Sequence, residues 1–289
     1  MGRSTYSVRQ NGAMRTDQGQ FTGRAGVAIH WQAWLPDDLP KAVVVVAHGF
    51  GEHIGRYGNL IDVIVPRGYA VYGPDHRGHG KSSGSRALID KHEYLLDDLD
   101  QVFAKVATDF PGTPVFLLGH SMGGNIALAS ALRNQTRLRG LVLSGALVTM
   151  HGVSKPLIVI AKLLGRVAPK LGAKKLSSSA VSRDPAVVAA YDADPLVFHG
   201  KMPAGTGAEL TKATQAFPAR LPSLTIPLLV VHGSADELVN VESGRTAHSL
   251  AGSADKTLKV YDGLAHEVFN EPEKATVLDD VANWLDAHV

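Results

Sequence analysis

The stretch LLGHSMGGNIALASAL, residues 117–132, contains the pattern Gly-x-Ser-x-Gly at Gly119, Ser121 and Gly123. A strand-like run, PVFLL (114–118), precedes the pattern, and a helix-like run of small residues follows it. In this strand–turn–helix context the pattern predicts a nucleophile elbow, a strained turn that exposes the serine hydroxyl. The two glycines fit that turn because it leaves no room for bulky side chains. The alternative is that Ser121 only caps the helix.

Strand-like and helix-like segments alternate along much of the chain. The strand-like runs cover residues 27–34, 42–48, 69–75, 114–119, 138–145, 227–233 and 258–263, and the helix-like segments cover 58–66, 93–109, 122–133, 241–251 and 275–286. This alternation predicts an α/β fold with a mostly parallel, doubly wound sheet and helices on both of its faces. The first strand alternates apolar and polar residues, as an edge or antiparallel strand would.

One long interval interrupts this alternation. About eighty residues between Ser144 and Pro227 contain no clear strand, which is too long for a loop inside a compact domain. We therefore predict an inserted helical cap over residues 147–225, with the core formed by 26–146 and 226–289. Residues 1–25 are polar and rich in glycine, and we expect them to form a flexible lead-in.

The first part of the predicted cap is cationic. No Asp or Glu occurs between Phe110 and Arg183, and the segment 154–175 interleaves apolar residues with lysine and arginine. One interpretation is a helix that packs on the core while its lysine side chains reach solvent. The other is an amphipathic cap that contacts anionic lipid or an apolar substrate.

The overall composition excludes several classes of protein and site. The 289 residues include no cysteine, so disulfides, thiolate metal sites and a cysteine nucleophile are excluded. A formal charge of +2 gives no reason to expect a nucleic-acid partner. The N-terminus lacks the apolar core of a signal peptide, and no run reaches the roughly 20 apolar residues that span a bilayer. We therefore expect a cytoplasmic or peripherally membrane-associated protein.

A serine nucleophile needs a base and an acid that orients the base. In folds with the nucleophile elbow, the acid and then the histidine follow later strands. Asp236 is the first acid after the next-to-last predicted strand, and His266 is the histidine that follows the last one. Glu237 is the second candidate for the acid, and Asp262 is the third because it adjoins the strand that precedes His266.

The loop after the strand AVVVVAH (42–48) has the composition of an oxyanion hole. Such a hole needs backbone N–H groups that point at the developing negative charge. The residue after the nucleophile, Met122, supplies one N–H group, and this loop supplies the second. The sequence His-Gly-Phe-Gly (48–51) lets the backbone turn its amides inward, and Phe50 is our candidate donor.

The same loop raises the alternative of a metal site. His48, Glu52 and His53 have the spacing H-x-x-x-E-H, which does not match helical zinc-binding motifs. His76 and His79 could supply further ligands. Because no complete ligand set is evident, we predict no metal and no cofactor, and His48 is expected to brace the loop.

Five motifs together resemble one family. They are HGFGEHIGRY (48–57), PDHRGHGKSSG (74–84), GHSMGG (119–124), YDADPL (191–196) and GLAHEVFNEPE (263–273). In combination they resemble the monoacylglycerol lipases of the α/β-hydrolase superfamily, especially the bacterial ones. The resemblance extends from about residue 25 to the C-terminus and includes the predicted cap.

The resemblance implies an α/β-hydrolase fold and a Ser–Asp–His triad at Ser121, Asp236 and His266. It implies oxyanion donors at Phe50 and Met122. It also implies a partly apolar lid that admits lipid and contacts membranes. The expected enzyme is a serine hydrolase that needs no cofactor and cleaves a monoacylglycerol to free fatty acid and glycerol.

By the same resemblance, Glu52, Arg56 and Tyr191 would line the polar end of the pocket that receives the glycerol head. Each of them also has a structural alternative. Arg56 could pair with Glu52 only to hold the loop, and Tyr191 could anchor the cap.

The triad alone does not determine the substrate. A carboxylesterase, lysophospholipase or thioesterase would use the same three residues. A non-catalytic lipid-binding protein on the same scaffold is a more distant alternative, because the sequence retains all three residues in order. The sequence gives no indication of oligomeric state.

Overall fold

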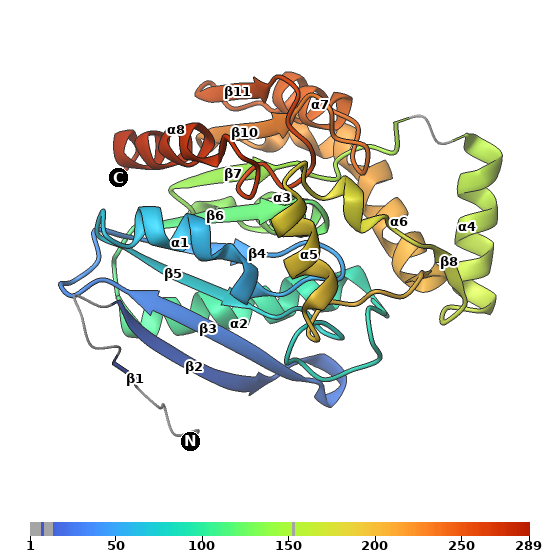
Figure 1. Cartoon of the computed structure of the whole chain (residues 1–289), viewed down its shortest axis with the longest axis horizontal. Helices are drawn as coiled ribbons and strands as arrows, with labels where there is room; N and C mark the ends of the chain where they lie inside the picture. Colours follow the sequence, from blue (N-terminus) through green and yellow to red (C-terminus); the bar gives the residue numbers. More distant parts are fainter. Residues whose placement is uncertain (1–6, 9–13, 152–153) are drawn as a thin grey trace.

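The computed structural model describes residues 7–8, 14–151 and 154–289, and a nine-stranded sheet forms its centre (Figure 1). In spatial order the strands are β1 (Ser7–Val8), β2 (Arg15–Thr22), β3 (Ala28–Leu35), β5 (Tyr69–Pro74), β4 (Ala42–Ala47), β6 (Val115–His120), β7 (Gly140–Ser144), β10 (Leu228–Gly233) and β11 (Lys256–Tyr261). Neighbouring strands from β5 to β11 pair in parallel, whereas β1, β2 and β3 are antiparallel to their neighbours. The predicted mostly parallel sheet is confirmed.

Helices cover both faces of the sheet. They are α1 (Gly58–Ile64), α2 (His92–Asp109), α3 (Met122–Arg133), α7 (Glu242–Leu250) and α8 (Lys274–Ala287). Short 3-10 helices are η1 (Arg24–Gly26), η2 (Ile54–Tyr57), η3 (Gln135–Arg137), η4 (Ser178–Ala180) and η5 (Leu221–Ser223). Apolar side chains of α2, α3 and α7 form one buried cluster with the sheet, and those of α1 and α8 form another. The sheet is therefore doubly wound, as predicted.

Strand β4 shows why its sequence is a continuous apolar run. Its side chains alternate between the two faces, so Val43 and Val45 join one cluster while Val44 and Val46 join the other. All four valines are fully buried. A strand covered on both faces has no solvent side, which explains the absence of an alternating pattern.

The expected flexible lead-in is wrong for residues 15–22. They form β2, which pairs with β3 along its whole length, from Arg15 opposite Leu35 to Thr22 opposite Ala28. The strand sequence RTDQGQFT buries little side-chain area, so its backbone hydrogen bonds, rather than an apolar pattern, hold it in place. The rest of the predicted lead-in falls mainly on residues 1–6 and 9–13, which lie outside the described residues.

The segment 147–225, predicted to be an inserted cap, is called the inserted segment below. It contains α4 (Lys155–Val167), β8 (Gly172–Lys174), α5 (Pro185–Ala193), β9 (Met202–Pro203) and α6 (Ala204–Arg220), and β8 pairs with β9. Helix α6 packs on the core, where Phe217 is buried in the same cluster as the side chains of α3. The segment lies beyond the carboxyl ends of the parallel strands (Figure 1).

Helix α4 packs on α6 and carries an exposed apolar face. A Cβ atom at Gly165 would lie 2.4 Å from Cβ of Ala208, so the two helices touch there. The exposed large apolar side chains of α4 and the turn after it are Val159, Ile160, Leu163, Val167 and Leu171. In the part of the chain that the structure describes, no helix combines the length and apolarity that crossing a bilayer requires.

Candidate active site

Ser121 lies at the sharp turn between β6 and α3. Its backbone angles are φ 55° and ψ −118°, a strained conformation for a residue with a side chain. A Cβ atom at Gly119 would lie 2.3 Å from the carbonyl oxygen of Gly123, and one at Gly123 would lie 1.9 Å from that of Ala47. Only glycine fits these two positions, so the Gly-x-Ser-x-Gly pattern forms the elbow that the sequence predicts.

His266 and Asp236 form a buried pair. Nδ1 of His266 lies 2.6 Å from Oδ2 of Asp236. Oδ1 of Asp236 accepts the backbone N–H groups of Leu238 and Val239, each at 2.9 Å. Nε2 of His232 lies 3.2 Å from Oδ2. These contacts fix the carboxylate in one orientation, and His266 with it.

The two other candidate acids do not contact His266. Glu237 is exposed, although it follows Asp236 directly. Asp262 is also exposed and accepts a hydrogen bond of 3.1 Å from the hydroxyl of Ser234. Of the three carboxyl groups considered from the sequence, the structure brings only Asp236 to His266.

The electrostatics of the pair favour a histidine base. Burial alone lowers the pKa of His266, but the carboxylates of Asp236, Glu267 and Glu52 outweigh it and raise that pKa above its usual value. Burial likewise opposes the charge of Asp236, yet His266 and His232 hold its pKa well below the usual range. Asp236 therefore stays ionised and accepts the Nδ1 proton of His266, which leaves Nε2 free to act as a base.

Ser121 and His266 line the same small cavity, of about 90 Å³, beneath the inserted segment. The apolar side chains of its lining include Leu147, Leu176, Val181, Met202, Leu210, Leu238 and Val239. The polar residues of the lining are Glu52, His120, Tyr191 and Glu267, and we call this group the polar end because Glu52, Tyr191 and Glu267 all contact Arg56. An amphiphilic molecule with an apolar tail and a small polar head fits this division of the lining.

The loop after β4 borders the cavity beside Ser121. The N–H group of Gly49 donates to Oε1 of Glu52 at 2.6 Å and is therefore already engaged. Phe50, the next residue, lines the cavity together with Met122. The aromatic ring of Phe50 packs edge-on against Phe198 of the inserted segment, with 6.1 Å between the ring centroids. The two residues predicted to supply oxyanion donors thus border one cavity with Ser121.

The histidines of this loop and its neighbour make local contacts. Nδ1 of His48 donates to the carbonyl oxygen of Gly49 at 2.8 Å, and Nε2 accepts the N–H group of His76 at 2.8 Å. His53 pairs with Asp194 of the inserted segment at 2.8 Å. Among the described residues, no group of three or more possible ligands could hold a metal ion. Through its contacts with Gly49 and His76, His48 ties its own loop to the neighbouring one, as expected of a residue that braces the loop.

Arg56 is held between two carboxylates at the polar end. Its Nη1 donates to Oε2 of Glu52 at 2.9 Å and to Oε1 of Glu267 at 2.6 Å, while Nη2 donates to Oε2 of Glu267 at 2.8 Å. The guanidinium also lies over the ring of Tyr191, 4.7 Å from its centroid. Burial opposes the charge of Arg56, but Glu267 and Glu52 outweigh it and raise its pKa.

Glu267 was not among the candidate site residues of the sequence analysis. It follows His266 directly in the motif GLAHEVFNEPE. This position beside the predicted catalytic histidine is the sequence signal that could have identified it. The three predicted residues of the polar end, Glu52, Arg56 and Tyr191, are brought together. The hydroxyl of Tyr191 has no hydrogen-bond partner among the described residues. The Arg56 guanidinium, in contrast, already donates hydrogen bonds to Glu267 from both of its Nη atoms.

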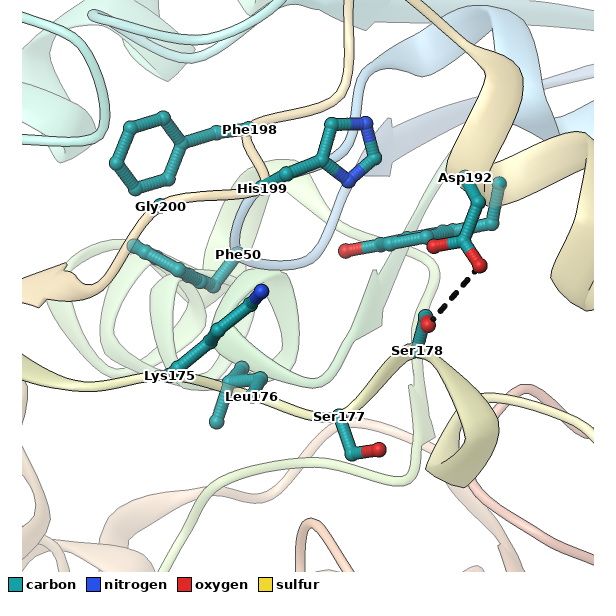
Figure 2. Close-up of a pocket in the computed structure, with 10 residues that line it drawn as sticks. Phe50, Lys175, Leu176, Ser177, Ser178, Asp192, Phe198, His199 and Gly200 are labelled. Carbon is teal, nitrogen blue, oxygen red and sulfur yellow. Dashed lines mark hydrogen bonds between the residues drawn. The ribbon is translucent and has the colours of Figure 1, made fainter.

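A second and larger pocket, of about 460 Å³ and called the outer pocket below, adjoins the first (Figure 2). The two pockets share Phe50, Leu176 and Tyr191 in their linings. The outer pocket has a mixed wall, to which Lys175, Ser177, Ser178, Asp192, Phe198, His199 and Gly200 contribute. The hydroxyl of Ser178 donates to the carboxylate of Asp192 at 3.2 Å across one side of it (Figure 2).

Known proteins resemble this chain over most of its length. The family described as serine aminopeptidase, S33, matches residues 38–273. A monoacylglycerol lipase of Mycolicibacterium smegmatis is 46% identical over 270 residues, which are 93% of this chain and 96% of that protein. The monoglyceride lipase of Homo sapiens is 36% identical over 90% of this chain and 87% of its own. The crystal structure of Paleococcus ferrophilus monoacylglycerol lipase superposes with a TM-score of 0.82 at 29% identity, covering 90% of this chain and 99% of that one.

Proposed function

The chain belongs to the serine aminopeptidase, S33, family of α/β-hydrolases, and we propose that, within this family, it is a monoacylglycerol lipase. It cleaves the ester bond of a monoacylglycerol to give a free fatty acid and glycerol. One observation carries the proposal: the strained Ser121 and His266, which is paired with Asp236, border one cavity whose lining combines apolar side chains with a cluster of polar ones. The Mycolicibacterium relative, a monoacylglycerol lipase, supports the substrate.

The proposed reaction proceeds through an acyl-enzyme. Oγ of Ser121 attacks the ester carbonyl while Nε2 of His266 takes its proton. The N–H groups of Phe50 and Met122 bind the oxyanion of the tetrahedral intermediate. His266 then gives the proton to the departing glycerol, and a water molecule, deprotonated by His266 in turn, hydrolyses the acyl-enzyme. Asp236 holds the imidazole in its working tautomer and stays ionised throughout.

The polarity of the cavity lining determines how the substrate is oriented in the proposed complex. The acyl chain lies against the apolar side chains of the lining, and the glycerol head lies at the polar end. There the hydroxyl of Tyr191, which has no hydrogen-bond partner in the described part of the chain, is available to a glycerol hydroxyl beside Glu52 and Arg56. The inner cavity of about 90 Å³ is smaller than typical ligand pockets of roughly 300–1,000 Å³. We propose that the inserted segment caps the cavity and that lipid enters through the adjoining outer pocket of about 460 Å³, which shares Phe50, Leu176 and Tyr191 with it.

The substrate proposal is tested by fatty-acid release from a panel that shares one acyl chain. The panel contains a monoacylglycerol, a diacylglycerol, a triacylglycerol, a lysophospholipid and an acyl-CoA. We expect the monoacylglycerol to dominate, because only about 10 Å³ is free between the charged side chains of Glu52, Arg56 and Glu267, which leaves no room for a large head group. Dominant turnover of the lysophospholipid or the thioester would contradict the proposed substrate but not the proposed catalytic triad. Absence of all turnover would favour a non-catalytic lipid-binding protein.

We also propose that α4 contacts membranes at their surface. Its exposed apolar side chains, among them Ile160 and Leu163, would enter the region of the head groups and upper acyl chains. Lys162, Arg166 and Lys170 lie in the same part of the chain and would face anionic lipid phosphates. Such contact would bring the cap to the surface from which the substrate is extracted.

Neutralising Lys162, Arg166 and Lys170 to glutamine is expected to weaken binding to anionic vesicles by roughly 100-fold, at about 1 kcal/mol for each cation near the surface. Co-sedimentation with vesicles of anionic and neutral phospholipid measures the effect, which should shrink as salt is added. The matched control neutralises three lysines in exposed ion pairs of the core, Lys41, Lys105 and Lys259. Equal binding of both triple variants would contradict a specific role for α4.

A further inference from the structure

The ion pairs around Arg56 join two loops that come from distant parts of the chain. Glu267 belongs to the loop that carries His266, and Arg56 belongs to η2, which follows the oxyanion loop. Arg56 also contacts Glu52, and Glu52 accepts the N–H group of Gly49, next to the proposed oxyanion donor. A continuous series of hydrogen bonds therefore runs from the histidine loop to the oxyanion loop.

This series is buried and has further anchors. The side chains of Arg56 and Glu267 are 10% and 7% exposed, so solvent screens their interaction little. The amide of Asn270 donates to Oε2 of Glu267 at 2.8 Å. The backbone N–H group of Glu267 donates to the carbonyl oxygen of Val181, at 2.7 Å, in the inserted segment. Glu267 is therefore fixed on both its side-chain and its backbone atoms.

We propose that Glu267 is a positioning residue for the reaction at Ser121. Through Arg56 and Glu52, it sets the position of the oxyanion loop relative to the loop that carries His266. This inference rests on the proposed serine-hydrolase function, but it does not depend on which acyl substrate is used. Small errors in the distance between a base and an oxyanion hole are costly, because both must meet the same reacting carbonyl group.

Glu267 also changes the charge around His266. The titratable groups that act on the imidazole are Asp236, Glu267, Glu52 and His120. Behind them, His232 contacts Asp236, and Arg56 pairs with Glu52 and Glu267. Glu52, Arg56 and Glu267 together carry one net negative charge, which favours the imidazolium formed during the reaction. Loss of the Glu267 charge would leave Glu52 and Arg56 with no net charge, and it would therefore lower the pKa of His266.

The test replaces Glu267 with glutamine, which keeps the shape of the side chain and removes its charge. The readout is the rate at which a fluorophosphonate labels Ser121, measured against pH. In that reaction the Oγ–P bond forms, the P–F bond breaks, fluoride leaves and His266 takes the proton. We expect labelling at the plateau to slow about tenfold as the two loops lose their fixed spacing. We also expect the acidic limb of the profile to move to lower pH.

A second variant, Arg56→Lys, separates geometry from charge. Lysine keeps the positive charge but cannot make the forked pair with Glu267. The plateau rate should fall by a similar factor, while the acidic limb stays near its wild-type position. The matched control is Glu93→Gln, because Glu93 is exposed on α2, pairs with the exposed Lys212, and lies outside the lining of the cavity. This control should label at the wild-type rate.

Several results would overturn the inference. Glu267→Gln labelling at the wild-type rate with an unmoved acidic limb would exclude positioning. A rise in the KM for monoacylglycerol alone, with labelling and nitrophenyl-ester turnover unchanged, would assign Glu267 to the glycerol head instead. If Glu267→Gln does not fold, an Arg56→Lys protein that labels at the wild-type rate would exclude the role by itself.

The same experiment distinguishes failure of the proposed function from failure of this inference. A wild-type protein that the fluorophosphonate does not label at Ser121 would refute the serine hydrolase and this inference together. A wild-type protein that is labelled but does not hydrolyse monoacylglycerol would refute only the substrate. The pH profiles of the Glu267 and Arg56 variants would then still decide whether Glu267 positions the loops.

Discussion

Replacing Ser121 with alanine is expected to lower monoacylglycerol turnover by roughly 10⁶-fold, because the acyl-enzyme can no longer form. The fold should be unaffected, since alanine keeps the Cβ atom that the elbow already accommodates. Fatty-acid release and the melting temperature measure the two effects. The control is Ser249→Ala, an exposed serine on α7, which should keep wild-type activity. An alanine variant of Ser121 that retained more than trace activity would refute the assignment of the nucleophile.

The glycine variant tests whether the elbow is strained. A φ of 55° with a ψ of −118° is unfavourable for residues with a side chain and accessible to glycine. Ser121→Gly should therefore be as inactive as Ser121→Ala but more stable, by about 1 kcal/mol after the entropy of glycine in the unfolded chain is counted. Equal stability of the two variants in urea unfolding would show that the turn stores little strain.

The fold was predictable where burial leaves a pattern in the sequence. The apolar run 42–48 became β4 (Ala42–Ala47), because a strand covered on both faces must be apolar throughout. Strand β2 was missed because a strand that buries few side chains leaves no such pattern, although its backbone pairs fully with β3. Sequence periodicity reports side-chain burial and does not report backbone pairing.

The candidate site, too, was predictable from the sequence only in part. The positions of Ser121 and His266 follow from the order of strands and turns, which the sequence displays. The roles of Arg56 and Glu267 depend on a contact between residues 211 positions apart, which no local pattern encodes. The choice between Asp236 and Glu237 depends on a single turn, in which the N–H groups of Leu238 and Val239 hold one carboxylate inward.

Changing Asp236 to asparagine is expected to lower kcat by about 10⁴-fold without unfolding the protein. The amide oxygen can still accept the N–H groups of Leu238 and Val239. The amide nitrogen would then face Nδ1 of His266 as a donor, so the imidazole would hold its proton on Nε2. In that tautomer Nε2 cannot accept the proton of Ser121. Fatty-acid release from a monoacylglycerol measures the loss.

The matched control is Glu237→Gln, which removes the same charge one residue further along the chain. Glu237 is exposed and makes no contact with His266, so the variant should keep nearly full activity. The pH profile gives a second readout, because the Asp236 carboxylate raises the pKa of His266 against the effect of burial. In Asp236→Asn the acidic limb should therefore lie at lower pH than in the wild type. If Glu237→Gln lost activity and Asp236→Asn kept it, Glu237 would be the acid and the loop between β10 and α7 would have to rearrange during catalysis.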